Sequence, residues 1–448
     1  MRYVIIGSSA AGISAVEAIR TKDKDSKIIV ISDEKNPLYS RCLISYLLAG
    51  TIDEKKIWYR KDSFFKNNKV EPLLGVKAIG IDIKKKEVAV SNFAGEGLKP
   101  SPANKENVKF DRLLIATGAS PKLENIPGVD KKGVFPLRTI EHMTEIQAML
   151  DKVKSVAVLG GGLIGLRAAY ALKNRGKDVS VFVKSGSILS QIVDKDAARI
   201  MQKRIEEKGI KIFTGVAAKE ITGDKSVKGV TLDNGSSHAC ELVIIGKGVS
   251  PNIEIARDSG IKTNWGILTN DYMETNIKDI FSAGDAAETS DIALGESSIN
   301  AIWPAACEQG RIAGLNMAGE KETYEGSLAM NSIEFFGLPV ISVGITRPDC
   351  RGRSLTAPTY EEIVKKDAAR NIYKKVVLKD GIVAGAVFVN SIDNIGVIGA
   401  LIKNKADITE IKNIILEDYF DYGKIMPLIK KSKKGFSEQE FKETILTL

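Results

Sequence analysis

The sequence has few of the residues that build disulfide scaffolds, zinc sites or histidine chemistry. Its four cysteines are far apart, and none has the CxxC spacing typical of zinc sites and cysteine-held iron–sulfur clusters. The cysteines are Cys42, Cys240, Cys307 and Cys350. With His142 and His238 as the only histidines, little remains for histidine-based metal binding or catalytic triads. We therefore expect no metal site.

Long apolar runs and a strong charge of one sign are also missing. No uninterrupted apolar stretch reaches about 18 residues, so no transmembrane helix is predicted. The apolar N-terminal run is broken by Gly7 and Gly12, and no cleavage-like segment of a secretory signal follows it. The net charge of +9 comes from interleaved lysines and acids, which argues against nucleic-acid binding. Because scattered free thiols fit a reducing cytosol, we expect a cytoplasmic protein without membrane contact.

What the sequence does contain is a globular composition and a repeated unit. At 44% apolar and 27% charged residues, the chain of 448 residues has the composition of a globular protein with roughly two to four domains. The unit begins with an apolar strand at Arg2–Ile6 and the turn GSSAAG at residues 7–12. A predicted helix over residues 13–20 and a strand at Lys27–Ser32 complete it.

The second copy begins about 153 residues further along the chain, and its turn has the full GxGxxG spacing of a dinucleotide fingerprint. A strand at Ser155–Leu159 leads into the turn GGGLIG at residues 160–165, a predicted helix over 166–174 and a strand at Asp178–Val183. In both copies the turn joins a buried strand to a helix, which directs backbone N–H groups and the positive helix end toward a pyrophosphate. Two copies therefore predict an enzyme that binds two dinucleotides.

The glycine turns supply the first candidate binding residues. In each turn the first glycine makes the turn, the small middle residue admits the phosphates, and the last glycine lets the helix pack on the strand. In the first copy these residues are Gly7, Ser9 and Gly12, and the neighbouring Ala11 is a further candidate. In the second copy they are Gly160, Gly162 and Gly165, with the neighbours Leu163 and Ile164 as further candidates.

The residues after the second strand of each copy differ in charge. An acid about 20 residues after the turn usually binds the ribose hydroxyls. In the first copy Asp33 or Glu34 can do so, and we prefer Glu34. The second copy has Lys184 and no carboxylate there, which favours the 2′-phosphate of NADP, although a solvated lysine beside an NAD site explains the pattern too. The choice between NAD and NADP stays open.

Four further segments, in the expected order, resemble the pyridine nucleotide-disulfide oxidoreductase superfamily of two-dinucleotide flavoproteins. The segments are LLIATG at residues 113–118, the strand and turn at 242–252, IFSAGD at 280–285 and WPAACEQG at 303–310. The resemblance implies FAD in the first unit, NAD(P)H in the second, and hydride transfer between them. The further cofactor-binding residues that it implies are Arg41, Cys42, Thr117, Gly118, Gly248, Gly284, Asp285 and Gln309.

The segment NPLYSRCLISYLLAG, residues 36–50, leads to two hypotheses about subclass. Cys42 lies where NADH oxidases, NADH peroxidases and coenzyme A disulfide reductases carry a redox-active cysteine. Arg41 and a helix starting near Leu43 would lower the pKa of this thiol. The segment also resembles nitrite and rubredoxin reductase-like relatives, which have no cysteine there, and Cys42 would then be a small apolar residue.

Three departures limit the thiol hypothesis. Ala10 replaces the histidine of peroxidases, and Arg167 replaces a glutamate that often follows the second glycine turn. The tail, with Tyr419 and Tyr422, does not reproduce the tyrosine-containing pattern of coenzyme A disulfide reductases. Arg167 would favour reduced flavin electrostatically, or it is a surface ion-pair partner. These features most resemble NAD(P)/FAD oxidoreductases of ferredoxin-linked systems, such as those associated with carbon monoxide dehydrogenase.

The C-terminal third lacks the dinucleotide pattern. We expect strands at residues 331–336, 340–343, 371–377 and 382–389, helices near 396–404 and 407–416, and a tight hairpin turn at Asp380-Gly381. The lysine-rich segment 430–434 is a solvated linker or a docking site for an acidic ferredoxin. In the family the equivalent domain forms a homodimer interface.

The sequence thus predicts an α/β fold with two Rossmann-like domains, the NAD(P) domain inserted in the FAD domain, and a C-terminal α+β interface domain. The expected boundaries are residues 1–112 and 245–326 for FAD, 113–244 for NAD(P) and 327–448 for the interface. The leading hypothesis is electron exchange between NAD(P)H and a ferredoxin- or rubredoxin-like carrier through FAD. The alternatives are a Cys42-dependent NADH oxidase or coenzyme A disulfide or persulfide reductase, and a nucleotide-sensing module.

Overall fold

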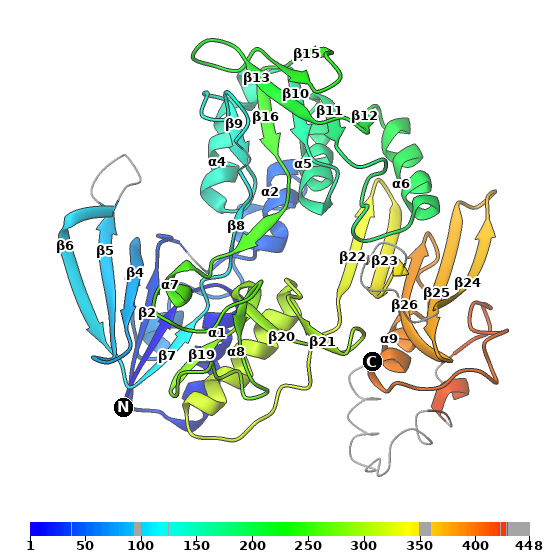
Figure 1. Ribbon diagram of the computed structural model, residues 1–448. Coiled ribbons are helices and arrows are strands. Elements are labelled where there is room, and N and C mark those ends of the chain that lie inside the picture. Colours follow the sequence, from blue (N-terminus) through cyan, green and yellow to red (C-terminus); the bar gives the residue numbers. More distant parts are fainter. Residues whose placement is uncertain are drawn as a thin grey trace. The chain divides into compact units, whose positions relative to one another are not determined.

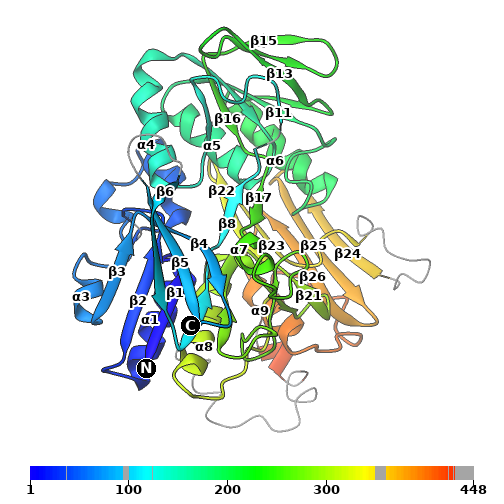
Figure 2. The ribbon, with the colours of Figure 1, turned by 60° about the vertical axis from the view of Figure 1, so that its left-hand side comes forward.

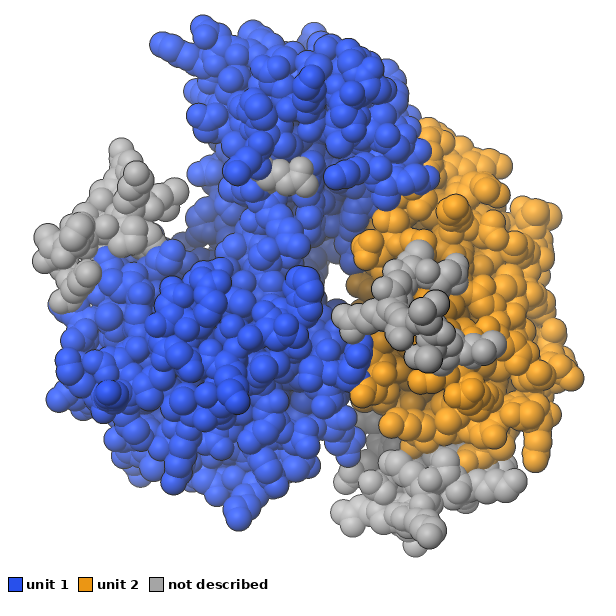
Figure 3. Space-filling model, in the orientation of Figure 1, with its two compact units in different colours: residues 1–186, 209–291, 296–327 blue, residues 187–208, 292–295, 328–448 orange. Residues whose placement is uncertain are grey.

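The structure, a computed structural model, describes residues 1–36, 38–93, 100–123, 125–348, 360–421, 423–426 and 428. The chain forms two compact units, coloured separately in Figure 3. The first contains residues 1–186, 209–291 and 296–327, and the second contains 187–208, 292–295 and 328–448. Cys350 and the lysine-rich segment 430–434 lie outside the described residues. Within the described ranges, no helix is long and apolar enough to cross a membrane.

The first unit is built around a sheet of five parallel strands in the order β19-β7-β1-β2-β3 (Figure 1). The strands are β1 Arg2–Ile6, β2 Lys27–Ser32, β3 Val70–Leu74, β7 Arg112–Ile115 and β19 Ile280–Ser282. Helix α1, Ala10–Lys22, connects β1 to β2. The predicted strand–turn–helix–strand order of the first copy is confirmed, because short apolar strands buried on both faces belong in a parallel sheet.

Alternate residues of β1 serve two different cores. Tyr3 and Ile5 pack with α1 and with helix α8, Trp303–Met317, on one face of the sheet. Val4 and Ile6 pack on the other face against the sheet β4-β5-β6, which Figure 2 shows alongside β1 and β2. These strands are β4 Val76–Asp82, β5 Glu87–Phe93 and β6 Pro100–Lys109. The period of two in an extended strand makes this division possible.

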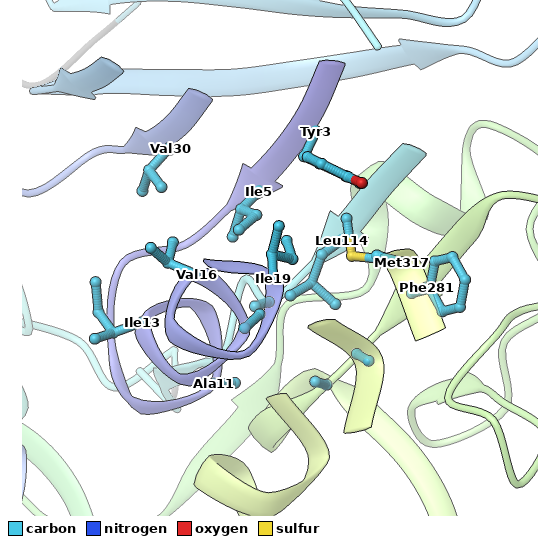
Figure 4. Packing of buried hydrophobic residues seen from close by; sticks show 14 of the residues in the cluster. Tyr3, Ile5, Ala11, Ile13, Val16, Ile19, Val30, Leu114, Phe281 and Met317 are labelled. Atoms are coloured by element: carbon cyan, nitrogen blue, oxygen red, sulfur yellow. The ribbon is translucent and has the colours of Figure 1, made fainter. Parts of the chain in front are cut away.

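The core between α1 and the sheet is apolar and closely packed. In Figure 4, Ile13, Val16 and Ile19 of α1 lie on the side of the helix that faces Ile5 of β1. All four side chains are almost completely buried. Burial of such side chains is the main favourable contribution to folding of this layer.

Helix α8 approaches α1 backbone to backbone. A Cβ atom on Gly310 would lie 2.1 Å from the carbonyl oxygen of Ala11, and one on Gly314 would lie 2.5 Å from that of Ala15. Only glycine allows this approach without displacement of the helices. The contact holds α8 at a fixed position on α1.

The second glycine turn belongs to a second sheet in the same unit, with the order β12-β11-β10-β16-β9 and all strand pairs parallel. The strands are β9 Val134–Pro136, β10 Ser155–Leu159, β11 Asp178–Val183, β12 Lys211–Thr214 and β16 Leu242–Ile245. Helix α5, Leu163–Asn174, connects β10 to β11, as predicted for the second copy. The second glycine turn therefore lies in another parallel α/β module of the first unit.

Smaller elements complete the first unit. The helices are α2 Ile44–Ala49, α3 Phe64–Asn67, α4 Ile140–Met149 and α7 Glu254–Arg257. The short strands are β8 Ala119–Pro121, β13 Ala218–Thr222, β14 Gly229–Leu232, β15 Ser237–Ala239, β17 Val249–Pro251, β18 Ile267–Leu268, β20 Ala287–Asp291 and β21 Glu296–Ser298. Strands β8 and β17 pair antiparallel where the chain passes between the two sheets.

The second unit is an antiparallel sheet in the order β22-β23-β26-β25-β24. Its elements are β22 Met330–Phe335, β23 Leu338–Gly344, β24 Tyr360–Asp367, β25 Ile372–Lys379, β26 Ile382–Val389, α6 Lys195–Glu207 and α9 Ile395–Lys403. Asp380 and Gly381 have φ of +52° and +78°. The predicted tight turn is therefore confirmed, since two positive φ values are required for the type I′ hairpin.

Two parts of the second unit differ from expectation. Residues 407–416 are not a helix but a run of turns, with N–H groups of Ile411 and Ile414 bonding three residues back instead of four. Their isoleucines pack into the core of this unit, which the turns permit without a regular helix. Strand β24 was missed because its alternating charged residues lie at a sheet edge, where ion pairs such as Lys365–Glu417 replace apolar burial.

The contact between α1 and α8 gives a stability prediction. Gly314→Ala is expected to lower the free energy of unfolding by about 1–3 kcal/mol, because its methyl group would overlap backbone atoms of Ala15. Gly399→Ala, in α9, makes the same change where no atom lies within 4 Å, and should stabilise by up to about 1 kcal/mol. Thermal and urea unfolding followed by circular dichroism measures both. Equal effects of the two variants would contradict the packing argument.

Candidate active site

The first glycine turn is shaped by its own backbone. A Cβ atom on Gly7, whose φ is +111°, would lie 2.0 Å from the carbonyl oxygen of Ala116, and one on Gly12 would lie 1.9 Å from that of Gly7. Ser9 precedes α1, and its side chain makes no capping hydrogen bond. The N–H groups of the first helical turn are therefore left for an external acceptor, such as a phosphate.

The second glycine turn repeats this arrangement and opens at its middle residue. A Cβ atom on Gly160 would lie 2.4 Å from the oxygen of Gly246, and one on Gly165 would lie 2.0 Å from that of Gly160. Gly162 has no atom within 4 Å of such a position. The outer glycines are thus required by packing, and the middle glycine leaves room for a phosphate. Leu163 and Ile164, half-buried, form the first turn of α5.

The acid preferred in the first copy belongs to a hydrogen-bonded cluster. Glu34 forms an ion pair with Arg41, and the Tyr39 hydroxyl donates to Glu34 Oε2 at 2.5 Å. Burial raises the pKa of Tyr39, so this hydroxyl remains a donor. Burial and the Glu34 charge raise the pKa of the adjacent Asp33. The cluster orients Glu34, whose carboxylate retains lone pairs for ribose hydroxyls.

Asp285 lies at the carboxyl end of β19, as the sequence predicts, and follows Gly284 in a short 3₁₀ turn. Arg138 donates to Asp285 Oδ2 at 2.8 Å. The Nε atom of Arg138 is buried and has no hydrogen-bond partner among the described residues. An unpaired buried donor is costly, which indicates a place for an acceptor from a ligand.

Gln309 contacts protein on every side. Its side chain is buried, its Oε1 accepts from the Gly284 N–H at 2.8 Å, and its Nε2 donates to Thr289 Oγ1 and the Tyr324 hydroxyl, both at 3.3 Å. Its role is therefore to hold the turn that presents Asp285.

Three further candidate residues lie where the chain passes between the modules of the first unit. Thr117 Oγ1 donates to the Asn252 carbonyl oxygen at 2.7 Å, and Asn252 Nδ2 donates to the Thr117 carbonyl oxygen at 2.9 Å. Gly118 and Gly248 have φ of +66° and +87°, with open space beside each Cα atom. These bonds hold together the two chain segments that pass between the sheets, and the glycines leave that crossing open.

Arg167 lies on α5 and Lys184 directly after β11. The Arg167 guanidinium stacks over the Tyr46 ring of α2, with its central carbon 4.6 Å from the ring centroid. This is a cation–π contact between the two modules. Lys184 is exposed.

The described surroundings of Cys42 oppose the activation that its neighbour Arg41 suggests. Its side chain is solvent-accessible, but the surrounding protein raises the pKa of the thiol above its ordinary value of 9.0, and the Asp285 carboxylate adds to this effect. The Ser40 hydroxyl opposes it only in part. Arg41 contributes little because its guanidinium binds Glu34 and Tyr39. These surroundings therefore favour the protonated thiol.

Sequence reasoning missed Arg138, Tyr39 and Tyr59. Arg138 follows β9 as an isolated arginine, and its partner Asp285 is 147 residues away in the sequence, so no local pattern indicated it. Tyr59 packs edge-on against Trp303, with ring centroids 5.1 Å apart. Its buried hydroxyl is a second donor without a partner in the part of the chain that the structure describes.

Comparison with known proteins assigns the chain to a family. The profile of the pyridine nucleotide-disulphide oxidoreductases matches residues 1–310, and that of the rubredoxin NAD+ reductase C-terminal domain matches residues 330–406. The NADH-dependent phenylglyoxylate dehydrogenase subunit epsilon of Aromatoleum evansii is 31% identical over 418 residues, which are 92% of this chain and 94% of that protein. The chain belongs to the pyridine nucleotide-disulphide oxidoreductase family.

Solved structures and longer relatives agree. The NAD-dependent persulfide reductase from A. fulgidus is 25% identical, with a TM-score of 0.83 and coverage of 92% of this chain and 79% of that one. The NADH:rubredoxin oxidoreductase from Clostridium acetobutylicum is 25% identical, with a TM-score of 0.72 and coverage of 92% and 97%. The chain spans about half (48%) of the length of the nitrite reductase [NAD(P)H] of Bacillus subtilis, with 31% identity.

FAD and NAD(P)H are the cofactors of this family, and the described residues fit them. The open space beside Gly162, at a helix N-terminus, suits the phosphates of a dinucleotide. The unpaired donor of Arg138 beside Asp285 suits the polar chain of a flavin nucleotide. The protein is therefore an NAD(P)H-dependent flavin oxidoreductase.

The contacts of Gln309 predict an effect on flavin binding. Gln309→Leu removes the acceptor of the Gly284 N–H and frees the turn carrying Asp285, so FAD affinity should fall roughly tenfold. Arg311→Gln, which changes an exposed ion pair on the same helix, should leave it unchanged. Titration of FAD into apoprotein, followed by flavin fluorescence, measures the affinities. A thermally weaker Gln309→Leu protein that binds FAD normally would show that Gln309 stabilises the fold alone.

The raised pKa of Cys42 predicts slow alkylation. Since the thiolate is the nucleophile, the rate with iodoacetamide should rise roughly tenfold per pH unit between pH 7 and 9 without a plateau. Mass spectrometry of the Cys42 peptide gives the rate, with Cys42→Ser as the control for assignment. A plateau below about pH 8 would mean that the thiol ionises more easily than its surroundings allow.

Proposed function

We propose that this protein passes electrons between NAD(P)H and a ferredoxin- or rubredoxin-like carrier through FAD. The observation that carries this choice within the family is that Arg41, the cation next to Cys42, binds Glu34 and Tyr39 instead of the thiol. Burial of Cys42 raises the pKa of its thiol in addition. The match of residues 330–406 to the rubredoxin NAD+ reductase C-terminal domain supports a carrier as partner. FAD supplies the chemistry, because a flavin accepts two electrons as hydride and releases them one at a time.

Different residues of the first unit would bind different parts of FAD. The N–H groups after Gly7 and around Ser9 would bind the FAD pyrophosphate, with Ala11 and Gly12 packing beneath it. Glu34 would bind the adenosine ribose, oriented by Arg41 and Tyr39. Asp285 would bind the ribityl chain, with Arg138 neutralising its charge.

The second glycine turn would bind the nicotinamide nucleotide. Gly162 leaves room for its phosphates, while Gly160 and Gly165 hold the turn against the sheet. Arg167, fixed over Tyr46, would lie on the helix nearest both cofactors and stabilise negative charge there. No residue of this scheme is required as a general acid.

The alternative is a Cys42-dependent NADH oxidase, or a coenzyme A disulfide or persulfide reductase. The accessible Cys42 side chain favours it. So does the likeness to a protein described as an NAD-dependent persulfide reductase. In this case bound FAD would have to lower the pKa of the thiol.

The remaining proposals concern the location, the oligomeric state and the domain boundaries of the protein. We infer a cytoplasmic homodimer whose interface is formed by residues 327–448. We also retain residues 1–112 and 245–326 as the FAD domain and 113–244 as the NAD(P) domain.

Replacement of Cys42 separates the two functions. Cys42→Ser should keep bound FAD and reduce a rubredoxin or ferredoxin with NAD(P)H at a rate within about twofold of the natural protein. Cys307→Ser, the same change at a half-buried cysteine, is the matched control. Absorbance of the carrier gives the rate, and partial reduction tests for a thiolate-to-flavin charge-transfer band. Loss of carrier reduction in Cys42→Ser alone, together with loss of that band, would reject the carrier proposal in favour of the thiol enzyme.

A further inference from the structure

The residue after β11 lies beside the second glycine turn. Strands β10 and β11 run parallel, and the Gly160 N–H donates to the Phe182 carbonyl oxygen at 2.9 Å. A Cβ atom on Gly161 would lie 2.7 Å from the Val183 side chain, so the turn and the strand end are in direct contact. Lys184, which follows Val183, is therefore held at the crevice where the adenosine ribose of a nucleotide on this turn lies.

The backbone on both sides of Lys184 is fixed. The Val216 N–H donates to the Val183 carbonyl oxygen, and the Gly215 N–H donates to the Ser185 carbonyl oxygen, both at 3.1 Å. The Lys184 side chain is exposed, and no carboxylate of the described residues forms an ion pair with it. The backbone of Lys184 is thus fixed at the end of β11, and its ammonium group is accessible to an anion.

No acid competes for the same place. The sequence has no aspartate or glutamate between Asp178, at the opposite end of β11, and Asp194. Asp194 caps α6 and accepts from Tyr373 at 2.7 Å and from the buried Lys375 at 2.7 Å, so its carboxylate is fully engaged in the second unit. This segment of the chain therefore places no free carboxylate beside the strand end.

The first module of the same chain provides the contrast. There the same strand register places Asp33 at the position of Lys184, and Glu34, which hydrogen bonds orient, comes directly after it. A carboxylate at this position binds the two hydroxyls of an unphosphorylated ribose, whereas a cation suits a ribose that carries a 2′-phosphate. The two modules have the same glycine turn but opposite charge at the ribose.

We propose that Lys184 binds the 2′-phosphate of NADP(H) and makes NADPH the preferred nicotinamide cofactor of this protein, an inference that rests on the proposed function. The bond joins an ammonium group to a phosphate dianion, which is the strong, charge-assisted kind. It acts on binding alone, because the 2′-phosphate is remote from the reacting nicotinamide ring. Lys184 should therefore lower the KM for NADPH and raise the affinity for the adenosine portion of the nucleotide, without changing kcat.

The test compares the two cofactors on the FAD-loaded protein. Stopped-flow reduction of the flavin should give NADPH a kcat/KM roughly tenfold or more above that of NADH. Lys184→Glu should reverse this preference, mainly through KM. Lys211→Glu, the same charge change at the exposed amino end of β12, should leave it unchanged. Added salt should weaken NADPH more than NADH.

Inhibition by adenosine diphosphates tests the same contact without turnover. In the natural protein, 2′,5′-ADP should compete more strongly than 5′-ADP, and Lys184→Glu should abolish the difference. If Lys184→Glu loses its flavin, the inhibitors on the natural protein decide the matter. Equal inhibition, or NADH preferred by the natural protein, would overturn the assignment and leave the proposed function intact. Failure of both cofactors to reduce the flavin would instead overturn the proposed function.

Discussion

The first nucleotide site depends on the backbone contact that brings α1 and α8 together at Ala11. The carbonyl of Ala11 occupies the space that a side chain on Gly310 would need, and its methyl group faces Gly284. The first glycine turn and the turn carrying Asp285, far apart in the sequence, therefore meet at one residue. Gln309, next to Gly310, then bonds Gly284 directly. A packing constraint between two helices thus fixes the relative positions of the first glycine turn and of Asp285, the groups proposed to bind FAD.

The two modules show how little of nucleotide choice lies in the glycine turn. Both turns are fixed by carbonyl oxygens within 2.4 Å of where a glycine side chain would start. This constraint does not distinguish one nucleotide from another, since any pyrophosphate can accept hydrogen bonds from exposed N–H groups at a helix end. Discrimination is left to the charge after the second strand, where one module has an oriented carboxylate and the other an exposed lysine.

A structural feature could be predicted from the sequence where it is determined by residues close together in the chain. The parallel strands, both glycine turns and the Asp380-Gly381 hairpin were predictable. Each depends on the apolar pattern or the backbone requirements of a few consecutive residues. Strand β24 and the turns of residues 407–416 were not predictable, since tertiary packing decides them. Arg138 and the role of Gln309 depend on partners distant in the sequence, which no local pattern shows.

Cys42 illustrates why residue type at a familiar position does not determine chemistry. An arginine beside a cysteine activates the thiol only if its charge is available, and here Arg41 is engaged by Glu34 and Tyr39. The nearby Asp285 carboxylate disfavours a second negative charge, although Arg138 offsets part of its effect. The acid assigned to the flavin ribose thus draws away the charge that would activate the thiol. Orientation of Glu34 and activation of the Cys42 thiol would therefore need the same guanidinium, and in this structure Arg41 binds Glu34.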